Sequence, residues 1–317
     1  VLHLLPFDAL VDENGKFLLQ QKDLKILSSA RDLVVSPLAR NNGELLIVAG
    51  PDYDIEYLKK EKKVILDRRR RGTSRGGIAA GLRMASVGLR SLSFSRLRGA
   101  ELEGATIKKV SNRKNKASVI HSLKRAEEQR LRELKAPPDM LHIATHGFFL
   151  STDESLIKRL LSLQRGASNR LPPPGDNPLL RAGLAFAGVN KNAPFLGDID
   201  TDNDGVLTAL EVLELNLIGT QLVVLSACET GVGEIHAGEG VYGLRRAFQE
   251  AGVESVLNSL WPVSDEGTRR LMTGFYTRLL DGQPSRIALK KTQLSLLKTE
   301  WDHPYYWAAF VMVGKKN

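Results

Sequence analysis

The feature that most constrains the fold is a set of short, predominantly apolar segments in the second half of the chain. Three of them are Met140–Ala144, Leu222–Leu225 and Ser255–Leu260. Amphipathic stretches typical of helices lie at Glu239–Glu250 and Thr268–Leu280. A strand without a polar face is buried on both sides, which proteins achieve by covering a mostly parallel sheet with helices. The pattern therefore predicts an α/β protein.

Weaker patterns predict the remaining elements. Glu44–Ala49 and Trp307–Val313 are apolar enough to be strands, and the first is followed by a Gly-Pro turn. Ser118–Leu134 and Ser285–Leu297 each begin with a small polar residue and are predicted helices. Tyr53–Arg98 is basic and contains scattered glycines, so we expect a long loop there.

Composition excludes several classes of protein. Hydrophobic residues make up 42% of the 317 residues, and no apolar run reaches the roughly 18 residues that a membrane-spanning helix needs. No basic, apolar, small-residue leader appears at the start of the sequence, so we do not expect a secreted protein. The single cysteine, Cys228, cannot form an internal disulfide or a cysteine zinc site. We therefore expect a cytoplasmic protein that does not associate with a membrane.

Positive charge is concentrated in one part of the chain. Residues 51–132 contain 22 Lys and Arg against 9 Asp and Glu, an excess of +13, and most of it lies in Lys59–Lys63, Arg68–Arg71 and Arg113–Lys116. Such blocks are usually solvated loops, although they also bind acidic partners or nucleic acid. No aromatic residues interleave the blocks, so we do not expect nucleic acid as a partner.

Two of the predicted strands run into a reactive residue. Met140–Ala144 leads to His146 and Gly147, and Leu222–Leu225 leads to Cys228. In open α/β sheets, ligands bind beyond the carboxyl ends of the strands. If the two strands are neighbours, an imidazole and a thiol meet there, which is the minimum for nucleophilic acyl transfer. The glycine after the histidine lets a backbone N–H approach a substrate oxygen.

Each residue alone also has a plainer interpretation. A lone cysteine beside an apolar strand is often an inert core residue, and a histidine at a strand end is often structural. His142 competes with His146 as the base, because strand alternation places both on one face. We favour His146, which lies at the strand end beside a glycine, and we expect His142 to be a packed or hydrogen-bonded core residue.

Five ordered motifs surround these residues, and two further segments extend the pattern over most of the chain. The motifs are Leu141–Gly147, Val224–Gly231, Gly238–Gly240, Ser259–Asp265 and His303–Phe310, and the further segments are Leu4–Leu10 and Asp204–Ala209. Together they closely resemble the CHAT family, caspase-like cysteine peptidases that often lie downstream of tetratricopeptide repeats. Tyr53–Arg98 matches the family least.

The resemblance implies a caspase–hemoglobinase-type α/β fold, in which a mostly parallel sheet is flanked by helices in three αβα layers. It divides the chain at residue 135. Residues 1–135 would be the N-terminal part of the CHAT region, either pseudo-caspase-like or a sheet extension, with a basic insertion at 53–98. Residues 136–317 would be the catalytic, caspase-like part.

The resemblance also assigns roles within the site. It implies His146 and Cys228 as the catalytic dyad, with the amides of Gly147 and Cys228 as oxyanion donors. The family is similar to separase, in which a carboxylate receives an arginine of the substrate, and the matching residue here is Asp265. Glu229, next to the cysteine, is a second candidate for substrate binding. Alternatively, Asp265 and the serine before it cap the following helix.

One further motif suggests a metal ion. The spacing of a calcium loop is present, with acidic residues at positions one, three and five, a glycine at six and a glutamate at twelve. The candidate ligands are Asp200, Asp202, Asp204, Val206 and Glu211. The alternative is an Asp/Gly turn followed by a helix N-terminus. We expect no cofactor to be required for catalysis, with Ca²⁺ as the alternative.

These observations favour a cysteine endopeptidase of protein substrates. The resemblance implies regulated proteolysis in bacterial defence or programmed cell death, triggered through an upstream repeat region or a regulatory protein. A carboxylate at Asp265 would direct cleavage to the bond after a basic residue. The alternative is a noncatalytic caspase-like interaction module that keeps the fold and recruits partners.

Overall fold

The structure is a computed structural model that describes residues 5–28, 43–55, 93–149, 179, 181–192, 204–226, 228–229 and 237–314. For residues 192, 228–229 and 237–241 only the backbone is described. No helix within these ranges is both long and apolar enough to cross a membrane.

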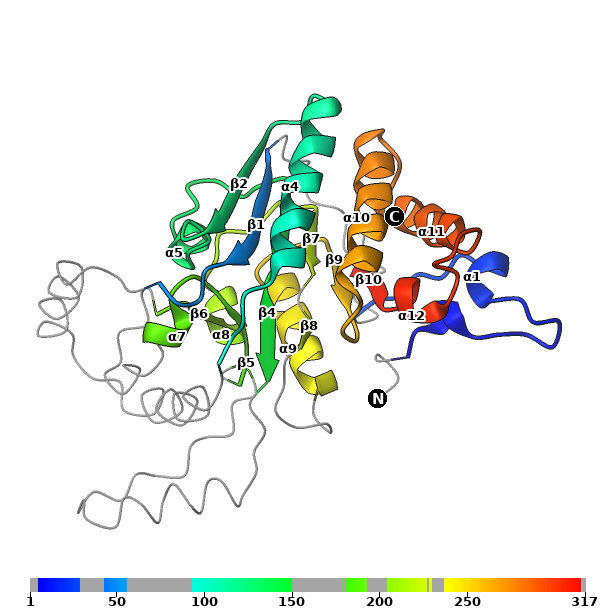
Figure 1. The fold of residues 1–317 in the computed structure, drawn as a ribbon, viewed down its shortest axis with the longest axis horizontal. Helices are drawn as coiled ribbons and strands as arrows, with labels where there is room; N and C mark the ends of the chain where they lie inside the picture. The colour runs from blue at the N-terminus through cyan, green and yellow to red at the C-terminus, as the bar shows by residue number, and fades with distance from the viewer. Residues whose placement is uncertain are drawn as a thin grey trace, which may run out of the picture.

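The centre of the molecule is a six-stranded sheet (Figure 1). Five neighbouring strands are parallel, and the strand at one edge is antiparallel to its neighbour. The order across the sheet is β10 (Phe310–Gly314), β9 (Ser255–Ser259), β7 (Leu222–Leu225), β3 (Met140–Ala144), β1 (Leu45–Pro51) and β2 (Ser118–Leu123). The predicted strands at 140–144 and 222–225 have the predicted bounds. Strands from both sides of residue 135 share this sheet.

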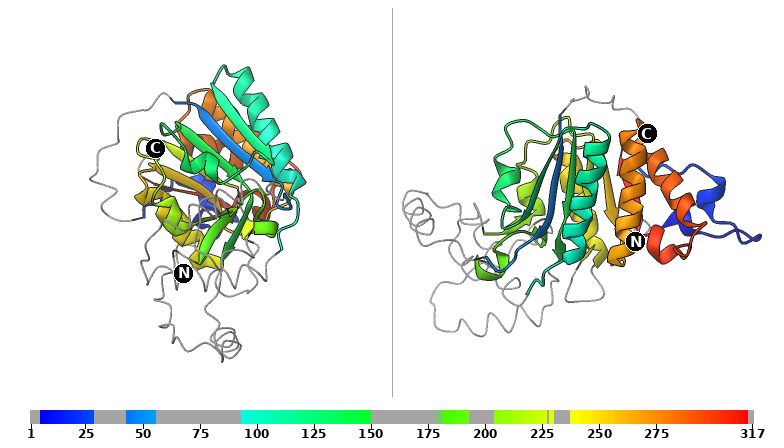
Figure 2. Two further views of the ribbon diagram at one scale, coloured as in Figure 1. Left: turned by 90° about the vertical axis from the view of Figure 1, so that its left-hand side faces the viewer. Right: turned by 45° about the horizontal axis from the view of Figure 1, so that its top comes forward.

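Helices cover both faces of the sheet, which gives the three layers that the sequence predicts. On one face lie α4 (Arg98–Arg113), α10 (Asp265–Leu280) and α11 (Ser285–Leu296), side by side (Figure 2). The other face is covered by α5 (Gln129–Arg132), α8 (Ala209–Val212) and α9 (Ala237–Glu250). Each interior strand is buried along its length, because alternate side chains enter the two apolar clusters.

A second, four-stranded sheet extends from the carboxyl ends of the central strands. Its order is β6 (Val206–Thr208), β5 (Ala182–Ala185), β4 (His146–Phe149) and β8 (Cys228–Glu229). The β4–β8 pair is parallel, whereas the β4–β5 and β5–β6 pairs are antiparallel. Both residues of the predicted dyad belong to this sheet.

Short elements complete the described chain. They are η2 (Phe7–Ala9), α1 (Leu18–Gln21), α7 (Val189–Asn192) and α12 (Pro304–Trp307). The N-terminal segment packs beside α11, where Lys290 Nζ donates to the Lys22 carbonyl over 2.9 Å. Ile26 forms a bridge with Val313, so residues of this segment lie along the outer side of β10.

One predicted element was wrong, and one helix was not predicted. The predicted helix at Ser118–Leu134 is strand β2 followed by a turn and the short helix α5. Its first residues include Val119 and Ile120, whose β-branched side chains fit a strand, and they pair in parallel with β1. Helix α4 was not predicted, and its glycines explain why. A Cβ on Gly104 would lie 2.5 Å from the Cβ of Ala49, so a small residue is required where the helix meets β1.

Candidate active site

The two predicted dyad residues are direct neighbours on paired strands. His142 pairs with Val224 in the central sheet, and His146 pairs with Cys228 in the smaller one. Each pair is separated by 82 residues, so the register between the two chain segments is the same on both sides of the sheet junction. Register partners on adjacent strands lie about 4.8 Å apart. The backbone therefore brings His146 and Cys228 together where the central strands end.

Hydrogen bonds secure the point at which the chain changes sheets. Ser226 N donates to the Ile143 carbonyl over 2.9 Å, which extends the β3–β7 ladder toward the cysteine. Thr145 Oγ1 donates to the carbonyl of Ala185 in β5. Tyr53 Oη lies 3.0 Å from Thr145 Oγ1 and accepts from the His146 N–H over 3.3 Å. Burial raises the pKa of Tyr53 to about 12, so this phenol stays protonated.

His146 lies in an aromatic cage. Its side chain is largely buried, and the ring centroids of Tyr53 and Phe94 lie 5.2 and 5.6 Å from that of the imidazole. Phe148 lies behind Phe94, at 6.1 Å between ring centroids. Burial lowers the pKa of His146 from its ordinary value of 6.5, and the hydrogen bond to a carbonyl opposes this shift. The imidazole is therefore neutral at neutral pH and able to accept a proton.

The partner of the imidazole determines which nitrogen accepts that proton. His146 Nε2 lies 2.8 Å from the carbonyl oxygen of Ser95. A carbonyl can only accept, so Nε2 carries the hydrogen. In the neutral ring the lone pair is then on Nδ1. A base with this tautomer takes a proton at Nδ1.

The structure also places the other predicted residues of this strand pair. Gly147 lies in β4 and pairs with Leu184 on one side and Glu229 on the other. Cys228 and Glu229 form β8, and only their backbone is described. The segment at 230–236 that follows, which includes part of the second motif, lies outside the described residues.

His142 belongs to a buried polar network below the dyad, as the sequence suggested. Its Nε2 lies 3.2 Å from Glu103 Oε1 and its Nδ1 lies 3.1 Å from Tyr276 Oη. Ser226 Oγ donates to the other oxygen of Glu103 over 3.0 Å. Burial and the Glu103 carboxylate raise the pKa of Tyr276 well above its usual value. The network links α4, α10 and β3 to the residue two positions before Cys228.

Asp265 occupies the first turn of α10, and its side chain is exposed. The N-cap of this helix is Ser264, whose Oγ accepts from Gly267 N over 3.2 Å. The carboxylate of Asp265 lies directly over Gly99, where a Cβ would come within 2.0 Å of its Cγ. Gly99 is in the first turn of α4, where the helix dipole favours an anion. Asp265 thus lies beside the segment that leads from Ser95 into α4.

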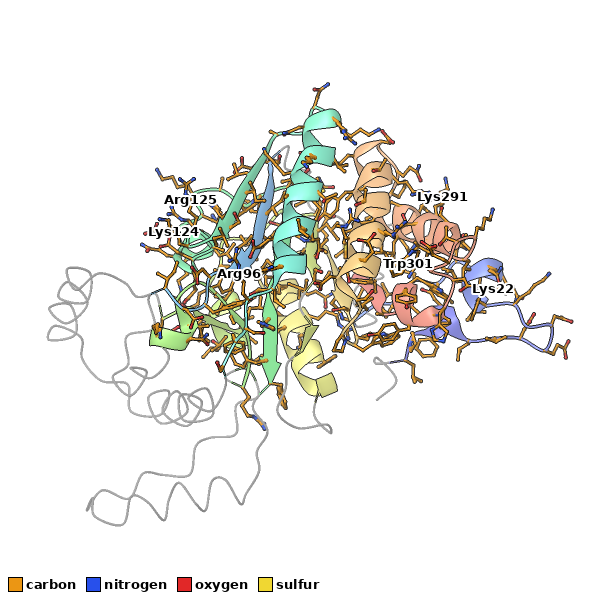
Figure 3. The ribbon with its side chains drawn as sticks, viewed as in Figure 1. Lys22, Arg96, Lys124, Arg125, Lys291 and Trp301 are labelled. Atoms are coloured by element: carbon orange, nitrogen blue, oxygen red, sulfur yellow. The ribbon has the colours of Figure 1, made fainter. Side chains whose placement is uncertain are left out.

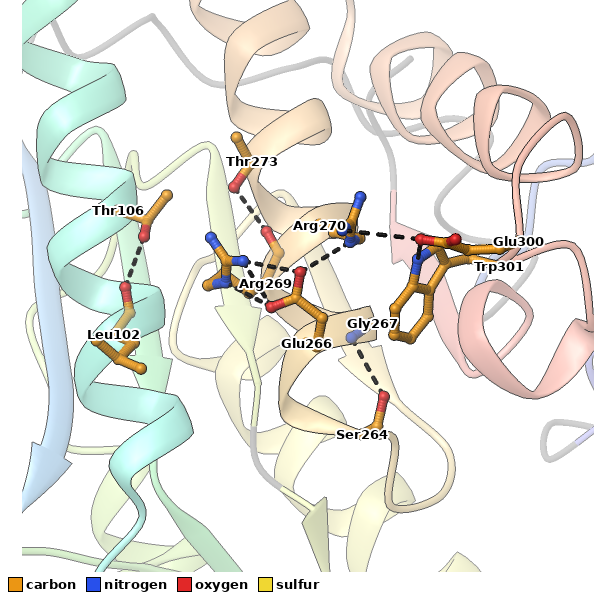
Figure 4. A network of polar contacts seen from close by, with 10 residues as sticks. All are labelled: Leu102, Thr106, Ser264, Glu266, Gly267, Arg269, Arg270, Thr273, Glu300 and Trp301. Atoms are coloured by element: carbon orange, nitrogen blue, oxygen red, sulfur yellow. Dashed lines mark hydrogen bonds and ion pairs between the residues drawn. The ribbon is translucent and has the colours of Figure 1, made fainter.

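The neighbouring acid, Glu266, is paired with two arginines of its own helix (Figure 4). Glu266 accepts from Arg269 Nε over 2.9 Å and from Arg270 Nε over 2.8 Å. Arg270 also stacks on Trp301, with 5.3 Å between its Cζ and the ring centroid. Asp265 makes no ion pair with any residue in the described ranges.

In the described half of the predicted calcium loop, both acidic side chains accept hydrogen bonds from the protein's own donors. Asp204 Oδ1 accepts from Val206 N over 2.8 Å. Glu211 Oε2 accepts from Thr208 N over 2.7 Å in the capping box of α8, and Glu211 Oε1 accepts from Arg132 over 2.8 Å. Asp200 and Asp202 lie outside the described residues. Within the described ranges, no three His, Cys, Asp or Glu side chains are arranged to hold a metal ion.

The basic blocks are described only in part. Lys59–Lys63 and Arg68–Arg71 lie outside the described residues. In the third block, Lys116 Nζ pairs with Asp139 over 2.5 Å and Lys114 pairs with Asp281. Other exposed cations, such as Arg96 and the Lys124–Arg125 pair after β2, lie apart on the surface (Figure 3).

Sequence reasoning missed the residues that surround the imidazole. Tyr53, Phe94 and Ser95 were assigned to a loop. Each lies far from His146 along the chain; Tyr53 precedes the histidine by 93 positions. The one available signal is that two aromatic residues border the basic insertion, one on each side.

The central sheet between helical layers, with an imidazole and a cysteine paired at its carboxyl edge, defines a caspase-like α/β protein. A model of the CHAT domain matches residues 1–315, so the chain belongs to the CHAT family, as the motifs predicted. Over 110 residues it is 36% identical to Tetratricopeptide repeat protein 28 of Homo sapiens and 34% identical to that of Mus musculus. Each match covers 34% of this chain and 4% of the relative, so the chain spans only a small part of those proteins.

Proposed function

We propose that this protein is a cysteine endopeptidase in which His146 and Cys228 form the catalytic dyad. The observation that carries the proposal is the direct register pairing of these two residues on β4 and β8. The neutral imidazole, with its hydrogen on Nε2, suits the role of base. The CHAT family supplies the second support, because it is a caspase-like peptidase family.

The steps follow from the roles of the two residues. His146 Nδ1 takes the thiol proton, and the Cys228 sulfur attacks the carbonyl carbon of the scissile bond to give a tetrahedral oxyanion. When this collapses, the C–N bond breaks and the leaving amine takes the proton from the imidazolium. Water, activated by the same imidazole, then hydrolyses the thioester and restores the thiol.

The oxyanion requires donors, and we assign the amides of Gly147 and Cys228 to this role. The support is their position on the paired strands beside the dyad. A donor of this kind contributes about 3–4 kcal/mol to the transition state.

For specificity, we propose that Asp265 receives a basic side chain of the substrate, with Glu229 lining the same end of the site. The support is that Asp265 is exposed, has no cation partner among the described residues, and lies beside the segment that contacts His146. An arginine pairs with a carboxylate through two parallel hydrogen bonds, so it would be preferred over lysine.

For the biological setting, we propose regulated proteolysis of a partner protein, in defence or in programmed cell death. The support is the CHAT family itself and relatives that are named for tetratricopeptide repeats. We assign the trigger to an upstream repeat region or a regulatory protein. The same relatives favour the second candidate, a noncatalytic interaction module, because helical repeats typically present binding surfaces.

Cleavage profiling with a peptide library distinguishes the two candidates. The proposal predicts that the wild-type chain cleaves after arginine and lysine, and that Cys228→Ala abolishes cleavage. It also predicts that His146→Ala lowers kcat/KM by about 100-fold or more, the usual contribution of general base catalysis. Asp265→Asn should abolish the basic preference while cleavage persists. No cleavage by the wild-type chain in complex with its repeat region would favour the interaction module.

A further inference from the structure

Asn190, in the short helix α7, joins two chain segments that lie 40 residues apart in the sequence. Its side-chain oxygen accepts from Phe94 N over 2.9 Å, and its Nδ2 donates to the Phe94 carbonyl over 2.9 Å. The second hydrogen of Nδ2 goes to Asp54 Oδ1 over 3.1 Å, and the backbone N–H of Asn190 donates to the Tyr53 carbonyl over 3.0 Å. One side chain thus satisfies both backbone groups of Phe94.

The next residue after Phe94 supplies the partner of the imidazole. The Ser95 carbonyl accepts from His146 Nε2, and the Phe94 ring forms one wall of the cage around the same imidazole. The two hydrogen bonds from Asn190 fix the orientation of the Phe94 backbone. This orientation directs the Ser95 carbonyl toward His146 Nε2. Asn190 itself makes no hydrogen bond to His146.

Helix α7, which carries Asn190, is itself tightly packed. Val189, the neighbour of Asn190, is fully buried beside Tyr53 and Phe94. Gly205 approaches α7 so closely that a Cβ there would lie 2.7 Å from Val189 N. Asn190 therefore projects from a rigid support, and its amide can impose a position on Phe94 rather than follow it.

We propose that Asn190 is a positioning residue for His146, which sets the Ser95 carbonyl on Nε2 and so keeps the proton-accepting lone pair on Nδ1. The inference rests on the proposed role of His146 as the base. It extends the site to an element that neither the dyad motifs nor the specificity residues include. If the role of Asn190 were merely structural, its side chain would connect Asp54 and Phe94 without affecting which imidazole nitrogen of His146 carries the hydrogen.

The test observes the imidazole directly in the full chain. Histidine is labelled with ¹⁵N, and the signal of His146 among the six histidines is assigned by its loss in His146→Gln. The wild-type chain should show Nε2 protonated and its proton protected from exchange with water. Asn190→Ala should lose this protection and show both tautomers, and its kcat/KM for a peptide substrate should fall about tenfold, the scale of other partners that orient histidines.

Asp54→Ala is the matched control, because it removes one partner of Asn190 and leaves both bonds to Phe94. It should retain the wild-type His146 signal. If Asn190→Ala does not fold, as judged by its thermal melt, Asn190→Asp decides. That variant keeps the size of the side chain and the acceptor for Phe94 N, but it cannot donate to the Phe94 carbonyl, so it should also lose the protected proton.

Failure of this inference differs from failure of the proposed function. A folded Asn190 variant with an unchanged, protected Nε2 proton overturns the inference, even if the wild-type chain cleaves peptides. A wild-type chain that cleaves nothing, yet loses the protected proton in Asn190→Ala, supports the positioning role and counts against the peptidase.

Discussion

Gly99→Ala tests the proposed specificity residue without altering it. Gly99 lies under the carboxylate of Asp265, and an added Cβ would come within 2.0 Å of the Asp265 Cγ. Ordinary contact begins near 3.4 Å, so the carboxyl carbon must move by about 1.4 Å. Because Asp265 is exposed, its side chain can swing away, and the variant should fold with little change in thermal stability.

The expected effect on catalysis follows from that displacement. A hydrogen bond to a charged group contributes about 1.5–3 kcal/mol, and each 1.4 kcal/mol corresponds to a factor of ten. Loss of a well-placed pair with a substrate arginine should therefore lower kcat/KM by roughly 10- to 150-fold. Substrates with a neutral residue at the same position should be cleaved at the wild-type rate.

The assay compares matched peptides that carry arginine or its uncharged isostere citrulline before the scissile bond. Gly99→Ala and Asp265→Asn should show the same loss of preference, and the double variant should be no worse than either alone. An undiminished arginine preference in Gly99→Ala, in a variant whose fold is intact, would refute the assignment of this carboxylate to the substrate.

Three further predictions concern stability, pH and metal. Glu103→Ala leaves Ser226 Oγ without its acceptor and removes the carboxylate 3.2 Å from the buried His142 Nε2, so it should lower the free energy of unfolding by about 1–3 kcal/mol in urea. Glu101→Ala, which removes a surface ion pair, should cost less than about 1 kcal/mol. Because burial lowers the pKa of His146, the base stays unprotonated to below pH 6.5, and the acid limb of the kcat/KM profile should lie below that pH. Phe94→Ala admits water to the imidazole and should move this limb to higher pH. A wild-type limb at or above pH 6.5 would contradict the burial of His146 among these aromatic rings. Since both oxygens of Glu211 are engaged, calcium and chelator should give the same melting temperature, and a rise with calcium would show that this side chain leaves its partners.

The parts of the fold that could be predicted are segments in which consecutive residues are apolar. Strands β3 and β7 are apolar on both faces, so their bounds follow from the sequence. Helix α4 gives a weak pattern, because Gly104 and buried polar residues such as Glu103 replace the apolar residues expected on its inner face. The helix depends on close packing against β1, which no local pattern encodes.

The site was predictable to a similar degree. The motifs predicted His146 and Cys228, and the strand pattern predicted that they meet if the two strands are neighbours. The sheet order places these strands side by side, with His146 and Cys228 in register. The cage and its tautomer-setting carbonyl were not predictable, because Tyr53 and Ser95 reach the imidazole through contacts across tens of residues. Physical chemistry explains these contacts once the backbone is known, but composition and spacing do not specify them.

The cooperation of one imidazole with one thiol is tested most directly by the rate at which an arginine-containing peptidyl ketone electrophile labels the chain. Cys228 is the only cysteine, so mass spectrometry of the adduct reports this thiol alone. The account predicts that His146→Ala slows labelling by about 100-fold or more, while His121→Ala, a change at the edge strand β2, labels at the wild-type rate. Equal labelling rates for the wild-type chain and His146→Ala would contradict it.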